Sequence, residues 1–471
     1  MEREDIERQV LPFWEREILP TLTEFIAIPN ESPGFDKDWA AHGHMQRAVA
    51  LVKGWIERQG VRGLSLRVLQ DGTRTPVLLA EVPGALPEVV LLYGHLDKQP
   101  PMVGWREDLG PWQPVREGDK LYGRGGADDG YAAFAAIATV KALQALGQPH
   151  ATLRILIECS EESGSTDLPH YLQAYGQELG EPTLVVCLDS GCGDYERLWS
   201  TTSLRGLVGV TLKVELLREG VHSGMAGGIV PNPLQVLRLL LDRLEDPATG
   251  RLKPEALHVE IPTERREQAR KAAQVLGGAA VGQMPFIEGV RPLSDDTTQL
   301  LLNGTWEPAL AAIAQEGLPA MGEGGNVLLP ALTLRLSLRI PPTLEPKTAS
   351  AAVKAALEAD PPFGARVTVT AGGEPGWNAP PLADWLGAAT DAASREFYGH
   401  AAGYFGIGGS IPFMHMIGER FPAAQFLITG VLGPNSNAHG PNEFLHVPYA
   451  QKLTCCLVRV LAAHHDHFRK G

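Results

Sequence analysis

Short apolar runs alternate with helix-like stretches in the first part of the chain. Three largely apolar runs, at 88–93, 152–157 and 183–188, are each bounded by turn-forming residues, which is typical of strands buried on both faces. Segments with helical character at 130–146 and 166–175 separate these runs. Because strand and helix alternate at this length, the pattern predicts an α/β sheet with helices on both faces.

The pattern changes after about residue 205. Apolar and polar positions alternate over 207–216, as in a strand that has one solvated face. The elements predicted beyond it are a helix at 231–244, a strand at 332–340, a helix at 347–359 and a strand at 366–371. With residues 250–325 set aside, this order approaches a β-α-β-β-α-β module in which one strand is still unplaced.

Alternating strand and helix return from about residue 377. The elements predicted there are a helix at 382–397, a strand at 425–429 and a closing helix at 445–465. We therefore predict a discontinuous larger domain, residues 1–205 and 377–471, interrupted by a smaller inserted domain, residues 206–376.

Composition and charge narrow the classes of partner. The chain has 41 basic and 55 acidic side chains and a formal net charge of −14, which argues against nucleic-acid binding because that function needs basic surfaces. A run of about 18 apolar residues is absent from the sequence, so no membrane association is expected. The first residues lack the apolar core of a signal peptide, and the five cysteines do not form a disulfide framework. The chain is therefore expected to be cytoplasmic.

Acidic residues and histidines follow each of the three buried runs. His95 and Asp97 follow the first run, Glu161 and Glu162 the second, and Asp189 the third. Since open α/β sheets bind ligands outside the carboxyl ends of their strands, these side chains are expected to converge. Two further sets, Asp128-Asp129 before the helix at 130 and His439 after the strand at 425–429, could join them.

A metal site explains why these residue types would share one place. Crowded carboxylates repel one another and lose hydration unless a cation compensates them, and carboxylate and imidazole are normal zinc ligands. On an extended chain, His95 could bind metal while Asp97 orients its ring, and Glu161 and Glu162 would point to opposite sides. Taken singly, each set also fits an ordinary role, such as helix capping by Asp128-Asp129.

Five motifs occur in order along the chain: Gly94-His95-Leu96-Asp97, Gly123-Arg124-Gly125-x-x-Asp128-Asp129, Glu161-Glu162-x-Gly164-Ser165, Asp189-Ser190-Gly191 and His439-Gly440-Pro441-Asn442-Glu443. Together they resemble the di-zinc dipeptidase, aminoacylase and carboxypeptidase family, and most of all its carnosinase-like dipeptidase branch. The resemblance covers nearly the whole chain. It implies an α/β fold in which a zinc-peptidase α/β sandwich, the catalytic domain, is interrupted by a smaller α+β lid domain that mediates dimerisation.

The resemblance also implies two divalent metal ions per chain. Zinc is the expected metal, and manganese or cobalt are alternatives because they use the same donors. The implied ligands are His95 and Asp189 for one ion, Glu162 and His439 for the other, and Asp128 as a bridge between them.

Catalytic roles follow from the same matching positions. The resemblance implies that Glu161 is the general base and that Asp97 is the partner of the His95 ring. It also implies a cis peptide bond between Asp128 and Asp129. An aspartate at position 189, where aminoacylase-like relatives carry a glutamate, favours the dipeptidase branch.

The lid is expected to contribute to substrate binding. His222 matches a histidine that crosses a dimer interface and stabilises the oxyanion in the neighbour's site, which implies a homodimer. Asn326 and Arg339 match substrate-binding positions, Arg339 by gripping a C-terminal carboxylate, and Gly409 and Ser410 match a substrate-binding loop. Without the resemblance, His222 fits a polar turn residue and Arg339 an ordinary charge at the end of a strand.

The expected function is hydrolysis of a peptide or amide bond in a small, dipeptide-like substrate with a free carboxylate. Glu161 would take a proton from a metal-bridging water and pass it to the leaving amine. One alternative is an N-acyl amino acid deacylase that uses the same residues. Another is a non-enzymatic scaffold, which predicts a degraded site, whereas every implied ligand is present. Two departures from the branch, Gly406-Ile407 in place of a charged pair and the lack of a lid histidine within 371–377, leave the substrate open.

Overall fold

The computed structural model describes residues 1–282 and 284–470, and the chain divides into two compact units. Unit 1 comprises Met1–Thr202, Ala379–Phe405 and Ile411–Gly471, and unit 2 comprises Ser203–Asn378 and Gly406–Ser410. Within the described residues, every helix is too short or too polar to cross a membrane. The catalytic and lid roles predicted for the two domains stay predictions.

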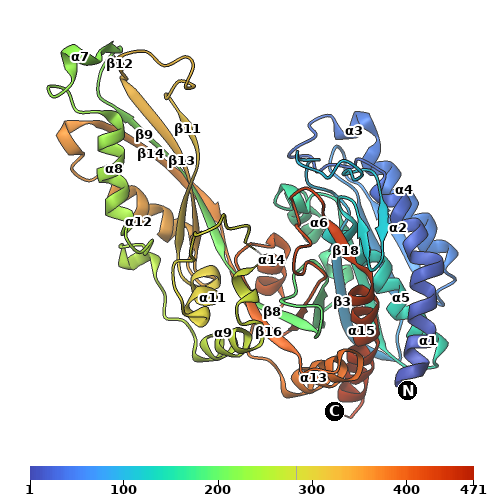
Figure 1. Cartoon of the computed structure of the whole chain (residues 1–471). Coiled ribbons are helices and arrows are strands. Elements are labelled where there is room, and N and C mark those ends of the chain that lie inside the picture. The colour runs from blue at the N-terminus through green and yellow to red at the C-terminus, as the bar shows by residue number, and fades with distance from the viewer. Residues whose placement is uncertain (283, 471) are drawn as a thin grey trace. The chain divides into compact units, whose positions relative to one another are not determined.

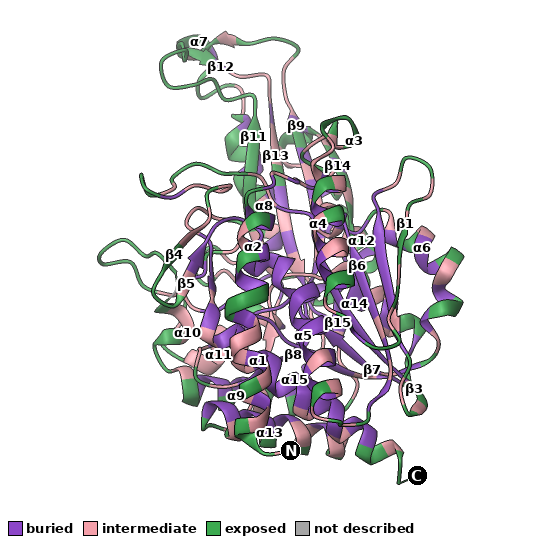
Figure 2. Cartoon of the chain, turned by 90° about the vertical axis from the view of Figure 1, so that its right-hand side faces the viewer, coloured by how far each residue is buried: buried purple, intermediate pink, exposed green. Residues whose placement is uncertain are grey.

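Unit 1 is built on a six-stranded sheet whose three central strands are the three predicted apolar runs. In spatial order the strands are β1 (Ser65–Leu69), β2 (Val77–Val82), β6 (Ala151–Glu158), β3 (Leu86–His95), β7 (Pro182–Cys187) and β17 (Gln425–Ile428). Strands β6, β3, β7 and β17 run parallel, while β2 is antiparallel to both of its neighbours. The central strands are buried almost throughout (Figure 2), as their apolar sequences predict.

Helices cover both faces of this sheet, as predicted. The helices α5 (Tyr131–Ala145) and α15 (Val447–Phe468) pack together against β3 and β6. On β3, Gly94 faces Ala132 of α5, whereas the ring of Tyr93 stacks on Phe413 of α14 (Pro412–Arg420), with ring centroids 3.5 Å apart. Since neighbouring residues of a strand point to opposite faces, α5 and α14 lie on opposite sides of the sheet.

Unit 2 has a four-stranded antiparallel sheet in the order β11-β13-β9-β14 (Figure 1). Its elements follow the chain as β9 (Gly206–Glu215), α8 (Pro233–Leu244), β11 (Ala309–Glu316), β13 (Ala331–Ile340), α12 (Pro346–Glu358) and β14 (Arg366–Glu374). This is the predicted β-α-β-β-α-β order, and β11 is the strand that the pattern left unplaced. The helices α8 and α12 pack together and bury the alternate apolar positions of β9 and β13.

The segment before β11 forms a small helical layer of its own within unit 2. It contains α9 (Thr263–Leu276) and α11 (Thr297–Thr305). Their shared core consists of Ile261, Ala269, Leu302 and Trp306.

Candidate metal centre

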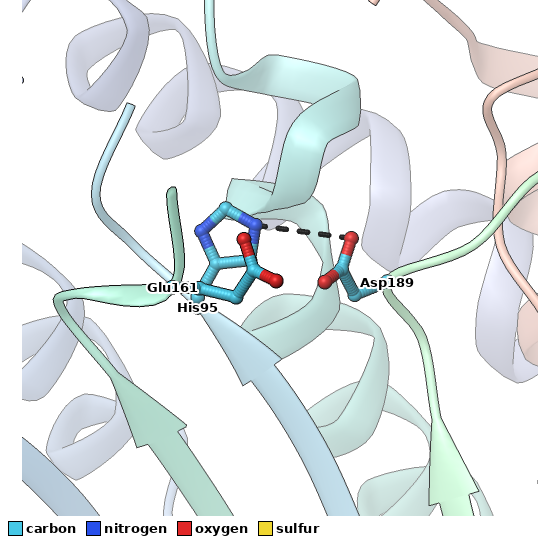
Figure 3. Close-up of side chains that lie close together, drawn as sticks. All are labelled: His95, Glu161 and Asp189. Atoms are coloured by element: carbon cyan, nitrogen blue, oxygen red, sulfur yellow. Dashed lines mark ion pairs between the residues drawn. The ribbon is translucent and has the colours of Figure 1, made fainter. Parts of the chain in front are cut away.

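The predicted site residues of unit 1 meet at one edge of its sheet. Because β6, β3 and β7 are parallel neighbours, their carboxyl ends lie together. His95 ends β3, Glu161 opens the short turn after β6, and Asp189 follows β7. The potential ligand atoms of these three side chains lie within 4.8 Å of one another (Figure 3). Those of His95, Asp128 and Glu162 do so as well.

Asp128 lies between two histidines. One of its carboxylate oxygens is 3.4 Å from Nε2 of His95, and the other is 3.0 Å from Nε2 of His439. His95 Nε2 also lies 3.8 Å from Asp189, and His439 Nε2 lies 3.4 Å from Glu162. The residues therefore form two groups that share Asp128, which is how a bridging carboxylate is placed in a two-ion site. The predicted cis peptide between Asp128 and Asp129 is confirmed.

The electrostatics of this cluster suit a cation. Burial, with Asp128 nearby, raises the pKa of Glu162 to about 8, and burial raises that of Asp189 to about 6. Burial and the Asp189 charge also raise the pKa of Glu161 well above its usual range. Among the described residues, His95 Nε2 and Glu162 Oε1 are buried without a hydrogen-bond partner. A divalent cation would stabilise the charged carboxylates and would bind the buried nitrogen and oxygen atoms that lack a hydrogen-bond partner.

The pKa shifts of His439 and Asp128 favour the charged forms of both groups, unlike those of the two glutamates and Asp189. Although burial opposes the shift, the hydrogen bond to Asp128 raises the pKa of His439 to about 9. Burial likewise opposes ionisation of Asp128, but the close approach of the His439 and His95 rings lowers the pKa of this carboxyl. In the absence of metal, the histidines thus compensate part of the negative charge.

Asp97 contacts both the His95 ring and the turn that carries the two glutamates. Its carboxylate accepts the backbone N–H groups of Glu161 (3.1 Å) and Glu162 (2.9 Å). The nearest acceptor for His95 Nδ1 is the backbone carbonyl of Asp97, at 3.0 Å, while the Asp97 carboxylate is 3.5 Å away. Asp97 therefore contacts the His95 ring chiefly through its main chain, and its side chain fixes the turn that carries both glutamates.

Sequence reasoning missed several residues that support the site. Gln99 donates to Glu162 Oε2 at 2.6 Å. The buried carboxylate of Glu158 accepts hydrogen bonds from three hydroxyls, those of Tyr93 (2.7 Å), Ser165 (2.8 Å) and Ser160 (3.2 Å). Arg124 and Glu443, which stood unassigned inside quoted motifs, form a buried ion pair. The position of Arg124 and Glu443 inside two of the quoted motifs is the sequence signal that could have pointed to them.

The predicted residues of unit 2 lie at two ends of its sheet. His222, exposed in β10 (Val221–His222), neighbours Asn326, whose carbonyl accepts the amide of Ser223 at 2.9 Å. Both lie beyond the end of the sheet where Ala331 starts β13, whereas Arg339 is near the other end of that strand. Eight residue steps separate these ends, roughly 27 Å. Within unit 2 of a single chain, His222 and Arg339 are therefore far apart.

Gly409 and Ser410 lie at the Arg339 end of unit 2. The preceding Gly408 packs against Arg205, since an added Cβ would lie 2.9 Å from the Arg205 guanidinium. Burial, and then the charge of Arg339, lower the pKa of Arg205 to about 10. The glycine loop and two guanidinium groups thus share one end of the sheet.

Comparison with known proteins agrees with these observations. Over 400 residues the chain is 28% identical to the cysteinylglycine-S-conjugate dipeptidase of Corynebacterium striatum, covering 81% of this chain and 83% of that protein. It is 29% identical over 358 residues to the Beta-Ala-His dipeptidase of Mus musculus, covering 73% and 71%.

Solved structures show the same fold. The dipeptidase Dug1p of Saccharomyces cerevisiae matches with a TM-score of 0.77 and 20% identity over 98% of both chains. Human carnosine dipeptidase 1 matches with a TM-score of 0.77 and 22% identity over 98% of this chain and 99% of its own. Residues 91–463, which contain all the predicted metal ligands, match the profile of peptidase family M20/M25/M40. The chain therefore belongs to peptidase family M20/M25/M40.

Proposed function

We propose that the chain is a metal-dependent hydrolase of dipeptide-like substrates. The observation that carries this proposal is Asp128, which lies between two histidine–carboxylate groups at the carboxyl edge of a parallel sheet. The relatives with matching sequences are named as dipeptidases, which favours dipeptides over N-acyl amino acids. The complete set of donor side chains argues against the non-enzymatic alternative.

The proposed ligands are those of the two groups. His95 and Asp189 would hold one divalent ion, Glu162 and His439 would hold the second, and Asp128 would serve both. When bound, two ions supply about four positive charges, polarise the scissile carbonyl and lower the pKa of the attacking water. Zinc fits these nitrogen and oxygen donors, and manganese and cobalt fit them as well.

Glu161 is the proposed general base. It takes a proton from the attacking water and delivers it to the leaving amine. The Asp97 carboxylate supports this role, because its hydrogen bonds to the amides of Glu161 and Glu162 keep the two glutamates in fixed positions. Arg339 is proposed to bind the C-terminal carboxylate of the substrate through its two-pronged guanidinium, beside Gly409 and Ser410.

Replacing Glu161 tests the base directly. Glu161→Gln keeps the size of the side chain but cannot accept a proton, so turnover is expected to fall about 10²–10⁴-fold while metal analysis still finds two ions per chain. The assay compares a panel of dipeptides with N-acetyl amino acids. Exposed Glu196, changed to Gln, is the control and should keep full activity. Near-normal turnover in Glu161→Gln would contradict the role.

We also propose a homodimer in which His222 and Asn326 serve the partner's site. Two observations support it: these residues lie at the opposite end of β13 from Arg339, and exposed apolar side chains lie near them in the chain. Close to them in the chain, Met225 is 77% exposed and Ile229 is 80% exposed. In the partner's site, His222 would donate to the oxyanion that forms during attack.

A cytoplasmic location without nucleic-acid or membrane partners rests on composition. All five cysteines are free and buried, which suits a reducing compartment. The net charge of −14 disfavours polyanionic partners.

A further inference from the structure

A buried arginine joins the loop that carries Asp128 to the loop that carries His439. Arg124 is 1% exposed. Its Nη1 donates to Glu443 Oε2 at 2.5 Å, and its Nη2 donates to the backbone carbonyls of His439 (3.1 Å) and Gly440 (2.8 Å). Its Nε donates to the carbonyl of Pro100 at 3.2 Å. The guanidinium therefore binds two other segments of unit 1, one at residues 439–443 and one at Pro100.

Glu443 completes the connection between the two loops. Its second carboxylate oxygen accepts the amide of Gly125 at 2.9 Å. Its backbone carbonyl accepts the amide of Gly123 at 3.0 Å. Glu443 has no exposed surface. The segment 123–125 is thus fastened to the segment 439–443 by backbone and side-chain bonds together.

The His439 loop needs such fastening. Four of its non-glycine residues, Asn435, Asn437, His439 and Asn442, have positive φ angles, 64° in the case of His439. Such conformations are unfavourable and persist only where the surroundings hold them. The His439 side chain is 56% exposed, so packing does little to fix the ring. Apart from the contact of its Nε2 with Asp128, the ring is positioned by the backbone to which Arg124 donates.

We infer that Arg124, paired with Glu443, is a positioning residue that presets His439 for the metal ion shared with Glu162. This inference rests on the metal ligands of the proposed function. It predicts that the two metal ions depend unequally on Arg124. His95 ends a central strand with 1% exposure and needs no such brace, so the ion held by His95 and Asp189 should not depend on Arg124.

Arg124→Lys separates the positioning role of the guanidinium from its ion pair with Glu443. Lysine keeps a positive charge beside Glu443 but lacks the planar fork that reaches Glu443 and two carbonyls at once. The measurement is calorimetric titration of the metal-free chain with zinc. We expect one of the two ions to bind about 10–100-fold more weakly, as is typical when a supporting group is changed, and the other to bind as in the wild type. The thermal midpoint of the metal-free variant reports whether it folds.

Two further variants sharpen the test. Glu443→Gln keeps the shape of the side chain and should weaken the same ion; it carries the test if Arg124→Lys does not fold. Arg459→Lys is the matched control, because Arg459 makes a two-pronged pair with Glu396, at 2.7 and 2.5 Å, between α15 and α13 (Asp384–Tyr398). It should bind both ions normally.

The outcomes separate this inference from the proposed function. If a folded Arg124→Lys chain binds both ions with wild-type affinity, Arg124 does not position His439. An equal loss of affinity for both ions would contradict the inference as well. A wild-type chain that binds fewer than two zinc ions contradicts the proposed ligand set itself, before any variant is made. Because zinc binding is the readout, the result does not depend on finding the substrate.

Discussion

His464 lies in α15 with no exposed surface. Its Nε2 is 2.8 Å from the Thr183 hydroxyl, while Nδ1 has no hydrogen-bond partner in the described part of the chain. Burial, followed by the charges of His467 and His465, lowers the pKa of His464 from 6.5 to about 4. The folded chain therefore keeps this ring neutral at a pH where the unfolded chain protonates it.

This difference makes stability depend on pH. The unfolded chain binds the extra proton between pH 6.5 and 4, so the free energy of unfolding should fall over that window as pH drops, by up to about 3 kcal/mol. Above pH 6.5 the contribution is constant. In His464→Gln, which can still bond to Thr183, the decline should be smaller. Urea unfolding at pH 7.5 and 4.5 measures it, and equal declines in both proteins would refute the assignment.

Side-chain type and position were enough to predict which acidic and histidine side chains lie close together, but not the residues that support them. His95, Glu161 and Asp189 were found because each follows a buried apolar run. The bonds of the Asp97 carboxylate go to backbone amides, which every residue has, so no sequence pattern marks them. Arg124 and Glu443 meet across 319 positions of the chain, and only the fold reveals that they pair.

At the level of elements, β3 and the start of α5 approach each other at Gly94. A Cβ at this position would lie 2.5 Å from Cβ of Ala132 and 2.6 Å from the Asp129 carboxylate. That carboxylate accepts the amide of His95 at 3.2 Å. The glycine thus lets the helix that follows Asp128 sit directly against the strand that carries His95.

Gly94→Ala should therefore damage both stability and the site. Overpacking at this contact is expected to lower the free energy of unfolding by about 1–3 kcal/mol and to reduce zinc affinity by displacing His95. Chemical denaturation and zinc titration measure the two effects. Gly372→Ala is the control, because nothing lies within 4 Å of a Cβ added there. Unchanged stability in Gly94→Ala would show that the helix and strand can separate freely.

Element prediction succeeded where burial imposes a periodic pattern. The runs that became β3, β6 and β7 were recognised because both of their faces are buried. Strand β11 was not, because its sequence, ALAAIAQE, is rich in alanine and most of the strand is exposed. A register shift between Ala312 and Ala314 further interrupts its alternation. Its pairing with β13 depends on tertiary contacts rather than on its own pattern.

For the whole molecule, the proposed homodimer makes a quantitative prediction. Glu161→Gln and His222→Ala should each be inactive alone, yet a mixture of the two should regain activity. Half of randomly re-formed dimers would be mixed, and each mixed dimer would have one complete site of two, so about one quarter of wild-type activity is expected. Dissociating and reassociating the mixed chains before assay measures it. No recovery in confirmed mixed dimers would place His222 in its own chain's site.

A change in periodicity is the sequence signal for the domain organisation. The sequence predicts an insertion at 206–376, and the compact unit in the structure spans Ser203–Asn378 with Gly406–Ser410. The short second segment could not be predicted, because five residues carry no periodic signal. Its place in unit 2 depends on contacts such as that of Gly408 with Arg205.

The chain enters and leaves the larger segment of unit 2, Ser203–Asn378, through paired strands. Ser203 lies opposite Asn378 in antiparallel register, and in unit 1 the amide of Ala379 donates to the carbonyl of Thr202 at 2.9 Å. For unit 1, everything between these residues is one surface loop whose ends already touch. Since the entropy of closing a loop grows only slowly with its length, the long segment Ser203–Asn378 costs unit 1 only slightly more loop-closure entropy than a short hairpin turn at the same place would.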